Sequence, residues 1–361
     1  MTHSAYIHIP FCLSKCKYCS FISFDKLDKK LGYIFSLLKE IDYYYQGEIL
    51  DTIYFGGGTP SLLTVDEFKK ILNKLNFNSQ TEVTLEVNPN DVNLEYLKSL
   101  REIGFNRISI GSQTFNDNIL KLIGRRHNSK EIFEAVQSAK TAGFENISID
   151  LIYGLPTQTV DMFKSDLENA LSLDIQHISL YGLKIDENCY FYNHMPEKLP
   201  DDDTQADMYL MAVETLKKHS FKHYEISNFA KENFESKHNL NYWKEQPYYG
   251  FGVASHGFVD GVRYSNYTTI EEYLNDPTNH EFGKFLTEKE KLEETIFLGL
   301  RVGDGINIHS INEKYNIDFE NKYKEILEKY TQTGHLIKTE NGYKFSNEGF
   351  LLSNIILADF I

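Results

Sequence analysis

Six short strand patterns alternate with helical patterns over the first half of the chain, and this alternation is the feature that most constrains the fold. The candidate strands are rich in Val, Ile, Tyr and Phe, as expected of strands buried on both faces. They fall at residues 5–8, 51–55, 82–87, 107–110, 147–153 and 177–181. Helical patterns separate them, at a capping box of Thr64 and Glu67 and at residues 94–103, 130–142 and 160–173. Six alternations are fewer than the eight of a closed barrel, so we expect an α/β fold with an open, partial (β/α)6 barrel.

The alternation ends near residue 184, and a polar segment follows at residues 196–203. We therefore predict a barrel domain over residues 1–195 and a C-terminal domain over residues 196–361. The second domain begins with a helical pattern at 204–219 and a stretch rich in Gly and Tyr. It ends with helices and a hairpin around the dipeptide Asn341-Gly342.

The overall charge and the cysteine content limit the class of protein. The formal net charge is −15, which argues against general nucleic-acid binding, because that function needs a basic surface. No apolar run approaches the length of a membrane-spanning helix and no signal peptide is evident, so we expect at most peripheral membrane association. Three of the four cysteines lie within eight positions, unlike a secreted disulfide framework. A cytoplasmic, reducing location is the expectation.

Cys12, Cys16 and Cys19 follow the first predicted strand at its carboxyl end, where β/α barrels build their sites. Three thiolates on one short loop can hold three irons of a 4Fe–4S cube and leave the fourth iron open. An open iron can chelate the amine and carboxylate of an amino acid. A structural zinc site is the alternative, but it needs a fourth ligand, for which His8 and Cys189 are the nearest candidates.

The run from Tyr6 through Cys12, Cys16, Tyr18 and Cys19 resembles the radical S-adenosylmethionine superfamily. Within it, the sequence resembles the branch of oxygen-independent coproporphyrinogen III oxidases and HemW-type heme chaperones. The resemblance extends to at least residue 301 and implies a 4Fe–4S cluster and S-adenosylmethionine as cofactors. It also implies a radical SAM barrel followed, from about residue 287, by a winged-helix-like α+β region.

The resemblance implies a pocket for S-adenosylmethionine at the strand ends. A glycine-rich segment after the second strand corresponds to the one that receives the methionine amino group. Polar residues at or beyond later strand ends correspond to ligands of the carboxylate, for which Arg is suited, and of the ribose hydroxyls. Two tyrosines are expected to pack or stack beside the cofactor. The implied set is Tyr6, Tyr18, Gly57, Gly58, Thr59, Glu86, Gln113, Arg125, which opens the next helix, and Asp150.

The segment His238-Asn-Leu-Asn-Tyr242-Trp243 matches the H-N-x-x-Y-W signature of the heme-chaperone branch. A neutral imidazole is a common axial ligand of heme iron, so His238 is a candidate ligand, with Tyr242 and Trp243 as flat porphyrin contacts. The same residues could instead pin this segment onto the barrel. His256 is a second candidate.

Two departures separate the chain from the oxidases. Phe21 stands where the oxidase has a fourth cysteine, and only five residues precede Tyr6, where the oxidase has a long extension. The resemblance therefore implies a heme chaperone that carries heme to respiratory-chain or other heme-accepting proteins and lacks coproporphyrinogen III dehydrogenase activity. The alternative is a radical SAM enzyme that acts on coproporphyrinogen III or another tetrapyrrole. A homodimer is left open.

Overall fold

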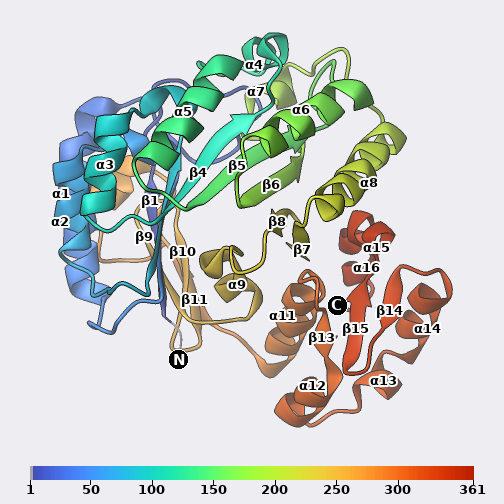
Figure 1. Cartoon of the computed structure of the whole chain (residues 1–361). Helices are drawn as coiled ribbons and strands as arrows, with labels where there is room; N and C mark the ends of the chain where they lie inside the picture. Colours follow the sequence, from blue (N-terminus) through green and yellow to red (C-terminus); the bar gives the residue numbers. More distant parts are fainter. Residues whose placement is uncertain (1–2) are drawn as a thin grey trace.

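The structure is a computed structural model that describes residues 3–361. Over these residues, a twelve-stranded sheet runs in the order β12-β11-β10-β9-β1-β2-β3-β4-β5-β6-β8-β7. Its centre is six parallel strands, which confirms the predicted open barrel (Figure 1). They are β1 Ser4–Ile9, β2 Thr52–Gly57, β3 Glu82–Val87, β4 Arg107–Gln113, β5 Asn146–Tyr153 and β6 His177–Gly182. Most of their residues are buried, as expected of strands that face helices on one side and the barrel interior on the other.

Helices between the strands cover the outer face of the sheet (Figure 1). They are α1 Lys30–Tyr44, α2 Val65–Leu72, α3 Leu94–Glu102, α4 Asp117–Leu122, α5 Ser129–Thr141 and α6 Val160–Ser172, with short 3-10 turns at Leu27–Lys29, Pro60–Leu62 and Pro89–Asp91. The predicted capping box of Thr64 and Glu67 starts α2. Helix α4 was not predicted. Arg125 therefore lies in the turn between α4 and α5, and the expectation that it opens a helix was wrong.

Strands from residues 222–285 lengthen the sheet at both edges. On one side lie β7 Lys222–Glu225 and β8 Asn228–Ala230; on the other lie β9 Tyr248–Phe251, β10 His256–Val259, β11 Val262–Ser265 and β12 Phe282–Phe285. β9 pairs in parallel with β1, from Ser4 opposite Tyr248 to Ile7 opposite Phe251. The stretch rich in Gly and Tyr thus continues the barrel sheet, which does not end at the predicted domain boundary of residue 195.

Four further helices connect these parts, and a small module ends the chain. The connecting helices are α7 Tyr190–Asn193, α8 Asp202–Lys218, α9 Lys237–Trp243 and α10 Ile270–Asn275. The module contains α11 Glu288–Leu300, β13 Ile306–Asn307, α12 Ile308–Tyr315, α13 Phe319–Lys322, α14 Lys324–Gln332, β14 Leu336–Lys338, β15 Gly342–Phe345, α15 Asn347–Leu351 and α16 Ser353–Ala358. Its strands β14 and β15 form the predicted hairpin. Among residues 3–361, no helix is long and apolar enough to span a bilayer.

Candidate functional site: a cavity at the carboxyl ends of the barrel strands

A cavity of about 380 Å³ lies where the cysteine loop meets the carboxyl ends of the barrel strands. It brings together residues that are far apart in the sequence and come from the six central strands or the loops after them. The residues singled out from the sequence that line it are Cys12, Cys16, Tyr18, Cys19, Gly57, Gly58, Thr59, Glu86, Gln113, Arg125 and Asp150. Tyr6 is not among the lining residues. Its hydroxyl contacts His8 Nδ1 at 3.1 Å, and its ring stacks on Tyr54 at 6.1 Å between centroids.

The cysteine loop is fixed at its root and along its length by backbone hydrogen bonds. Cys12 N donates to Phe24 O at 3.0 Å, and Lys17 N donates to Ile123 O at 3.0 Å. Burial, with smaller contributions from the neighbouring Cys16 and Cys12 thiols, raises the pKa of the Cys19 thiol to about 11. Cys12, Cys16 and Cys19 all line the cavity, but in this conformation no three His, Cys, Asp or Glu side chains of residues 3–361 are placed to hold a metal ion together.

The two candidate fourth ligands of a zinc site do not face this cavity. The ring nitrogens of His8 are both in contact, Nδ1 with the Tyr6 hydroxyl and Nε2 with Ile22 O at 2.9 Å. Cys189 is buried in a small apolar cluster with Ile123 and Phe191. Neither side chain lines the cavity, which leaves three protein thiols there.

The glycine-rich segment lies against the root of the cysteine loop. Gly58 N donates to Ile9 O at 2.9 Å, and Thr59 N donates to Phe11 O at 2.8 Å. A Cβ on Gly58 would lie 2.8 Å from Phe11 O, so only glycine permits this approach. Gly57 has a φ of +108°, which also favours glycine. These glycines bring the end of β2 to the thiols.

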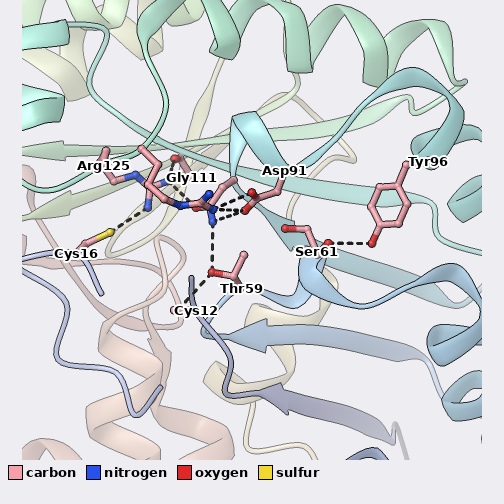
Figure 2. Close-up of polar contacts among 10 residues, drawn as sticks. Cys12, Cys16, Thr59, Ser61, Asp91, Tyr96, Gly111 and Arg125 are labelled. Carbon is pink, nitrogen blue, oxygen red and sulfur yellow. Dashed lines mark hydrogen bonds and ion pairs between the residues drawn. The ribbon is translucent and has the colours of Figure 1, made fainter. Parts of the chain in front are cut away.

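Hydrogen bonds join two of the thiols through residues of the next loops (Figure 2). Thr59 Oγ1 donates to Cys12 Sγ at 3.4 Å, and the Arg125 guanidinium donates to Cys16 Sγ at 3.5 Å. Asn88 lies between them: its amide nitrogen donates to Thr59 Oγ1 at 3.3 Å and its oxygen accepts from Arg125 at 2.7 Å. Sequence reasoning missed Asn88. Its signal was a polar residue directly before Pro89, just beyond the end of β3.

Arg125 is a half-buried cation that forms no ion pair with a carboxylate among the described residues. Its other contacts are the oxygens of Asn88 and Gly111 and the sulfur of Cys16, and its Nε atom is buried without a hydrogen-bond partner. The neighbouring Arg126, by contrast, forms an ion pair with Asp91 at 2.8 Å. Because burying a charge is costly unless it is paired, Arg125 provides a strong site for an anionic group of a ligand.

Gln113 ends β4 in an unusual backbone conformation. Its φ is +69°, and the pairing of β4 with β5 shifts register between Gly111 and Gln113. A bulge of this kind redirects a side chain, and a non-glycine residue at positive φ carries strain that is common at functional sites. The bulge places Gln113 on the cavity wall.

Two half-buried carboxyl groups face the same cavity. Tyr54 donates to Glu86 Oε1 at 2.7 Å, and Ser109 donates to Asp150 Oδ1 at 3.0 Å. Burial, followed by the nearby Asp150 carboxylate, raises the pKa of Glu86 to about 7. Burial also raises the pKa of Asp150. The cavity therefore has a cationic wall at Arg125 and an acidic wall at Glu86 and Asp150.

This combination fits S-adenosylmethionine and a three-thiolate cluster. S-adenosylmethionine carries a carboxylate, which suits Arg125, and a positively charged sulfonium, which suits the two carboxyl groups. Its two ribose hydroxyls can also donate hydrogen bonds to carboxylate and amide oxygens. The thiols receive hydrogen bonds from Thr59 and Arg125, as the sulfur ligands of iron–sulfur clusters do.

The residues singled out for heme lie at the opposite end of the barrel. His238 is 1% exposed; its Nδ1 contacts Thr52 Oγ1 and its Nε2 contacts the Tyr242 hydroxyl, both at 2.7 Å. Trp243 is half-buried in the same helix, near Arg301 of the C-terminal module. His256 is exposed at the start of β10. In this conformation His238 has no free ring nitrogen for a metal, so its role as a heme ligand stays a prediction.

The fold and the site define the class of the protein. Residues 6–170 match the family model "Radical SAM superfamily", and residues 286–352 match "HemN C-terminal domain". The match to the radical SAM domain implies a 4Fe–4S cluster and S-adenosylmethionine. The structure is similar to coproporphyrinogen III oxidase (HemN) from Escherichia coli, a radical SAM enzyme, with a TM-score of 0.88 and 24% identity over 99% of this chain and 90% of that one. At this identity the likeness shows the fold.

Full-length relatives identify the family. The chain is 38% identical to the heme chaperone HemW of Lactococcus lactis over 99% of this chain and 97% of the relative. It is 36% identical to the heme chaperone HemW of Bacillus subtilis over 99% of both. The chain belongs to the HemW heme chaperone family.

Proposed function

We propose that this protein binds heme and passes it to respiratory or other heme-accepting proteins, and that it holds a 4Fe–4S cluster and S-adenosylmethionine in the cavity of the barrel. The observation that carries the cofactor part is the uncompensated Arg125 cation beside three thiols in one cavity. The full-length similarity to relatives named heme chaperones carries the heme part.

In this proposal, Cys12, Cys16 and Cys19 would hold a 4Fe–4S cluster, and S-adenosylmethionine would bind beside it. When bound, the cluster supplies electrons one at a time. Arg125 grips the carboxylate, and Asn88 holds the guanidinium in place through its 2.7 Å contact. Gly57, Gly58 and Thr59 position the amino group at the end of β2.

The remaining residues of the cavity orient the other groups of the cofactor. Gln113 and Asp150 bind the ribose hydroxyls. Glu86 places negative charge near the sulfonium when its carboxyl is ionised. Tyr18, which burial keeps protonated by raising its pKa, packs beside the cluster loop.

The test is anaerobic reconstitution with iron and sulfide, followed by spectra with and without S-adenosylmethionine and then with added heme. We expect about four irons per chain, as a 4Fe–4S cube requires, and an electron paramagnetic resonance signal that S-adenosylmethionine changes. We also expect saturable heme binding and heme transfer to an apo-cytochrome. Absence of heme binding would refute the chaperone function.

The same preparation tests the enzymatic alternative. With reductant, S-adenosylmethionine and coproporphyrinogen III, we expect no protoporphyrinogen, because Phe21 and not a cysteine follows the third thiol at the cavity mouth. Formation of protoporphyrinogen would show that the chain is a coproporphyrinogen III dehydrogenase.

A further inference from the structure

Large apolar side chains are exposed on two segments that pack against each other beside the cavity. Phe21, 66% exposed, and Leu13 belong to the cysteine loop, and Phe21 lines the cavity. Tyr190, 51% exposed, Tyr192 and Met195 belong to α7 and the residues just after it. We call these five residues together with the exposed His194 the entrance platform. Exposed apolar groups gathered at a cavity mouth mark a binding surface more often than scattered single ones do.

Direct contacts join the two segments of the entrance platform. Phe191 N donates to Lys17 O at 3.0 Å, and Ser20 Oγ donates to Asp186 at 3.2 Å. Behind them, Tyr18 packs against the buried cluster that contains Phe191. The α7 segment therefore packs against the loop that carries the thiols. Leu183, Lys184 and Asp186, just before α7, line the cavity itself.

His194 has the geometry of a metal-binding imidazole. Its ring stacks on Tyr190, with centroids 4.1 Å apart and planes 4° apart. Its Nδ1 contacts Tyr190 O at 3.2 Å, and because a carbonyl only accepts, Nδ1 carries the proton. The lone pair of the neutral ring is then on Nε2, for which no partner occurs among residues 3–361. A backbone carbonyl that fixes the tautomer in this way is the usual second contact of a metal-ligating histidine.

We propose that the entrance platform is the heme site, with His194 Nε2 as an axial ligand of the iron. Tyr192 and Phe21 provide apolar contacts for the porphyrin, and Tyr190, whose ring is parallel to that of His194, holds the imidazole in place. This inference rests on the proposed chaperone function. It locates the bound heme next to the cavity that we propose for the cluster.

The charges at the platform suit the two carboxylates of heme. Lys17 Nζ lies 5.8 Å from the Tyr190 ring centroid, and Lys15 Nζ reaches Asn188 O at 3.5 Å. Neither lysine has a carboxylate partner within the described residues, whereas Lys184 is paired with Asp186 at 2.7 Å. Lys15 and Lys17 are therefore available to the propionates.

Two other histidines serve as controls. His219 is exposed and makes the same contact, from Nδ1 to the carbonyl four residues earlier, Thr215 O, at 2.9 Å. The preceding helix α8, however, carries no exposed large apolar side chain. His238 belongs to the signature segment but has both ring nitrogens occupied.

The experiment titrates ferric heme into the reconstituted full-length protein and follows the Soret band together with magnetic circular dichroism of the iron. Wild type is compared with His194→Ala, Tyr190→Ala, Tyr190→Phe, His219→Ala and His238→Ala. We expect His194→Ala to weaken heme binding about tenfold or more and to remove the histidine signature. Added imidazole should restore that signature. Tyr190→Ala should weaken binding, and Tyr190→Phe should retain it. His219→Ala and His238→Ala should leave affinity and signature unchanged.

The outcomes separate this inference from the function on which it rests. If wild type takes up no heme, both the proposed chaperone function and the proposed heme site at the entrance platform are refuted. If wild type binds heme and His194→Ala has an unchanged affinity and signature, the platform fails while the function stands. Loss of the histidine signature in His238→Ala alone would move the site to the other end of the barrel.

Discussion

The two ends of the barrel differ in the partners that their polar side chains have within the protein. At the amino end, α9 packs across the first residues of the strands: His238 N donates to Glu82 at 3.1 Å, and Asn241 donates to Ser4 Oγ at 2.7 Å. At the carboxyl end, Arg125 has no carboxylate partner and the pKa of Glu86 is raised to about 7. Helix α9 thus satisfies several polar groups at the amino end, although Arg107 Nε and Asn146 Oδ1 there are buried without hydrogen-bond partners. Arg125 and Glu86 at the carboxyl end line the cavity, where a ligand can reach them.

This difference is typical of β/α barrels. Their catalytic and binding residues lie at the carboxyl ends of the strands, and residues at the amino ends contribute to stability. The difference teaches that motif membership alone does not assign a role. The sequence resemblance assigned both His238 and Arg125 to binding motifs, but the buried hydrogen bonds of His238 favour a structural role in the described conformation. The predictions below test this contrast.

Removal of a cluster thiol should have the largest effect. Cys16→Ser should abolish cluster assembly, because it removes one of three protein ligands, and should leave the fold intact. Iron and sulfide content after reconstitution measures the cluster, and far-ultraviolet circular dichroism checks the fold. Cys189→Ala is the matched control, since this buried thiol lies outside the cavity, and it should assemble a full cluster. Assembly of a full cluster in Cys16→Ser would show that the cavity does not hold the cluster, and would contradict that part of the proposed function.

At the amino end, His238→Ala should cost stability rather than cofactor binding. It leaves the buried Thr52 hydroxyl and the Tyr242 hydroxyl without their partner, which we expect to lower the free energy of unfolding by about 2–4 kcal/mol. Urea unfolding of the protein without cofactors measures the loss. An unchanged midpoint together with lost heme binding would contradict the structural role.

The sequence predicted the barrel well because its strands and helices follow local patterns. All six central strands, the capping box at Thr64 and the terminal hairpin were predicted, and the structure confirms them. The extra strands β7–β12 were not, because they are short and join the sheet through contacts distant in sequence, such as that of β9 with β1. Pairing of this kind leaves no periodic signal in a four-residue strand.

Prediction of the site from the sequence had a similar limit. Ordered motifs pointed to the residues that line the cavity, but they did not distinguish Tyr6, which is turned toward Tyr54 and His8. Nor did they reveal Asn88, whose importance lies in the two partners that it joins. The tautomer of His194 depends on the carbonyl of Tyr190, a contact that only the short helix α7 creates.

At the carboxyl end, Arg125→Ala should weaken binding of S-adenosylmethionine. Loss of a charge-assisted contact of about 1.5–3 kcal/mol corresponds to a loss of affinity of about 10- to 150-fold. Calorimetric titration of the reconstituted protein measures it. Arg126→Ala is the control, because Asp91 already neutralises that guanidinium, and it should bind within a few-fold of wild type. Equal losses in the two variants would show that Arg125 has no special role.

The smallest predicted effect is a pH dependence that arises at Glu86. Its pKa of about 7 means that the folded protein without cofactors holds a proton that the unfolded chain releases near pH 4.5. The free energy of unfolding of the protein without cofactors should therefore fall as pH rises from about 4.5 to 7. Binding of a cationic ligand favours the ionised carboxyl, so affinity for S-adenosylmethionine should rise about tenfold between about pH 6 and 8.

Glu86→Gln provides the decisive comparison for this last effect. The amide keeps the shape of the side chain and its contact with Tyr54 but cannot ionise. Its affinity for S-adenosylmethionine should be low and nearly constant over the same pH range, measured by the same calorimetric titration. A pH dependence that persists in Glu86→Gln would assign the proton to Asp150, the other half-buried carboxyl of the cavity, whose pKa burial also raises. In either case the titrating group lies at the carboxyl end, because burial at the amino end lowers the pKa of His238 to about 3 and keeps it neutral throughout.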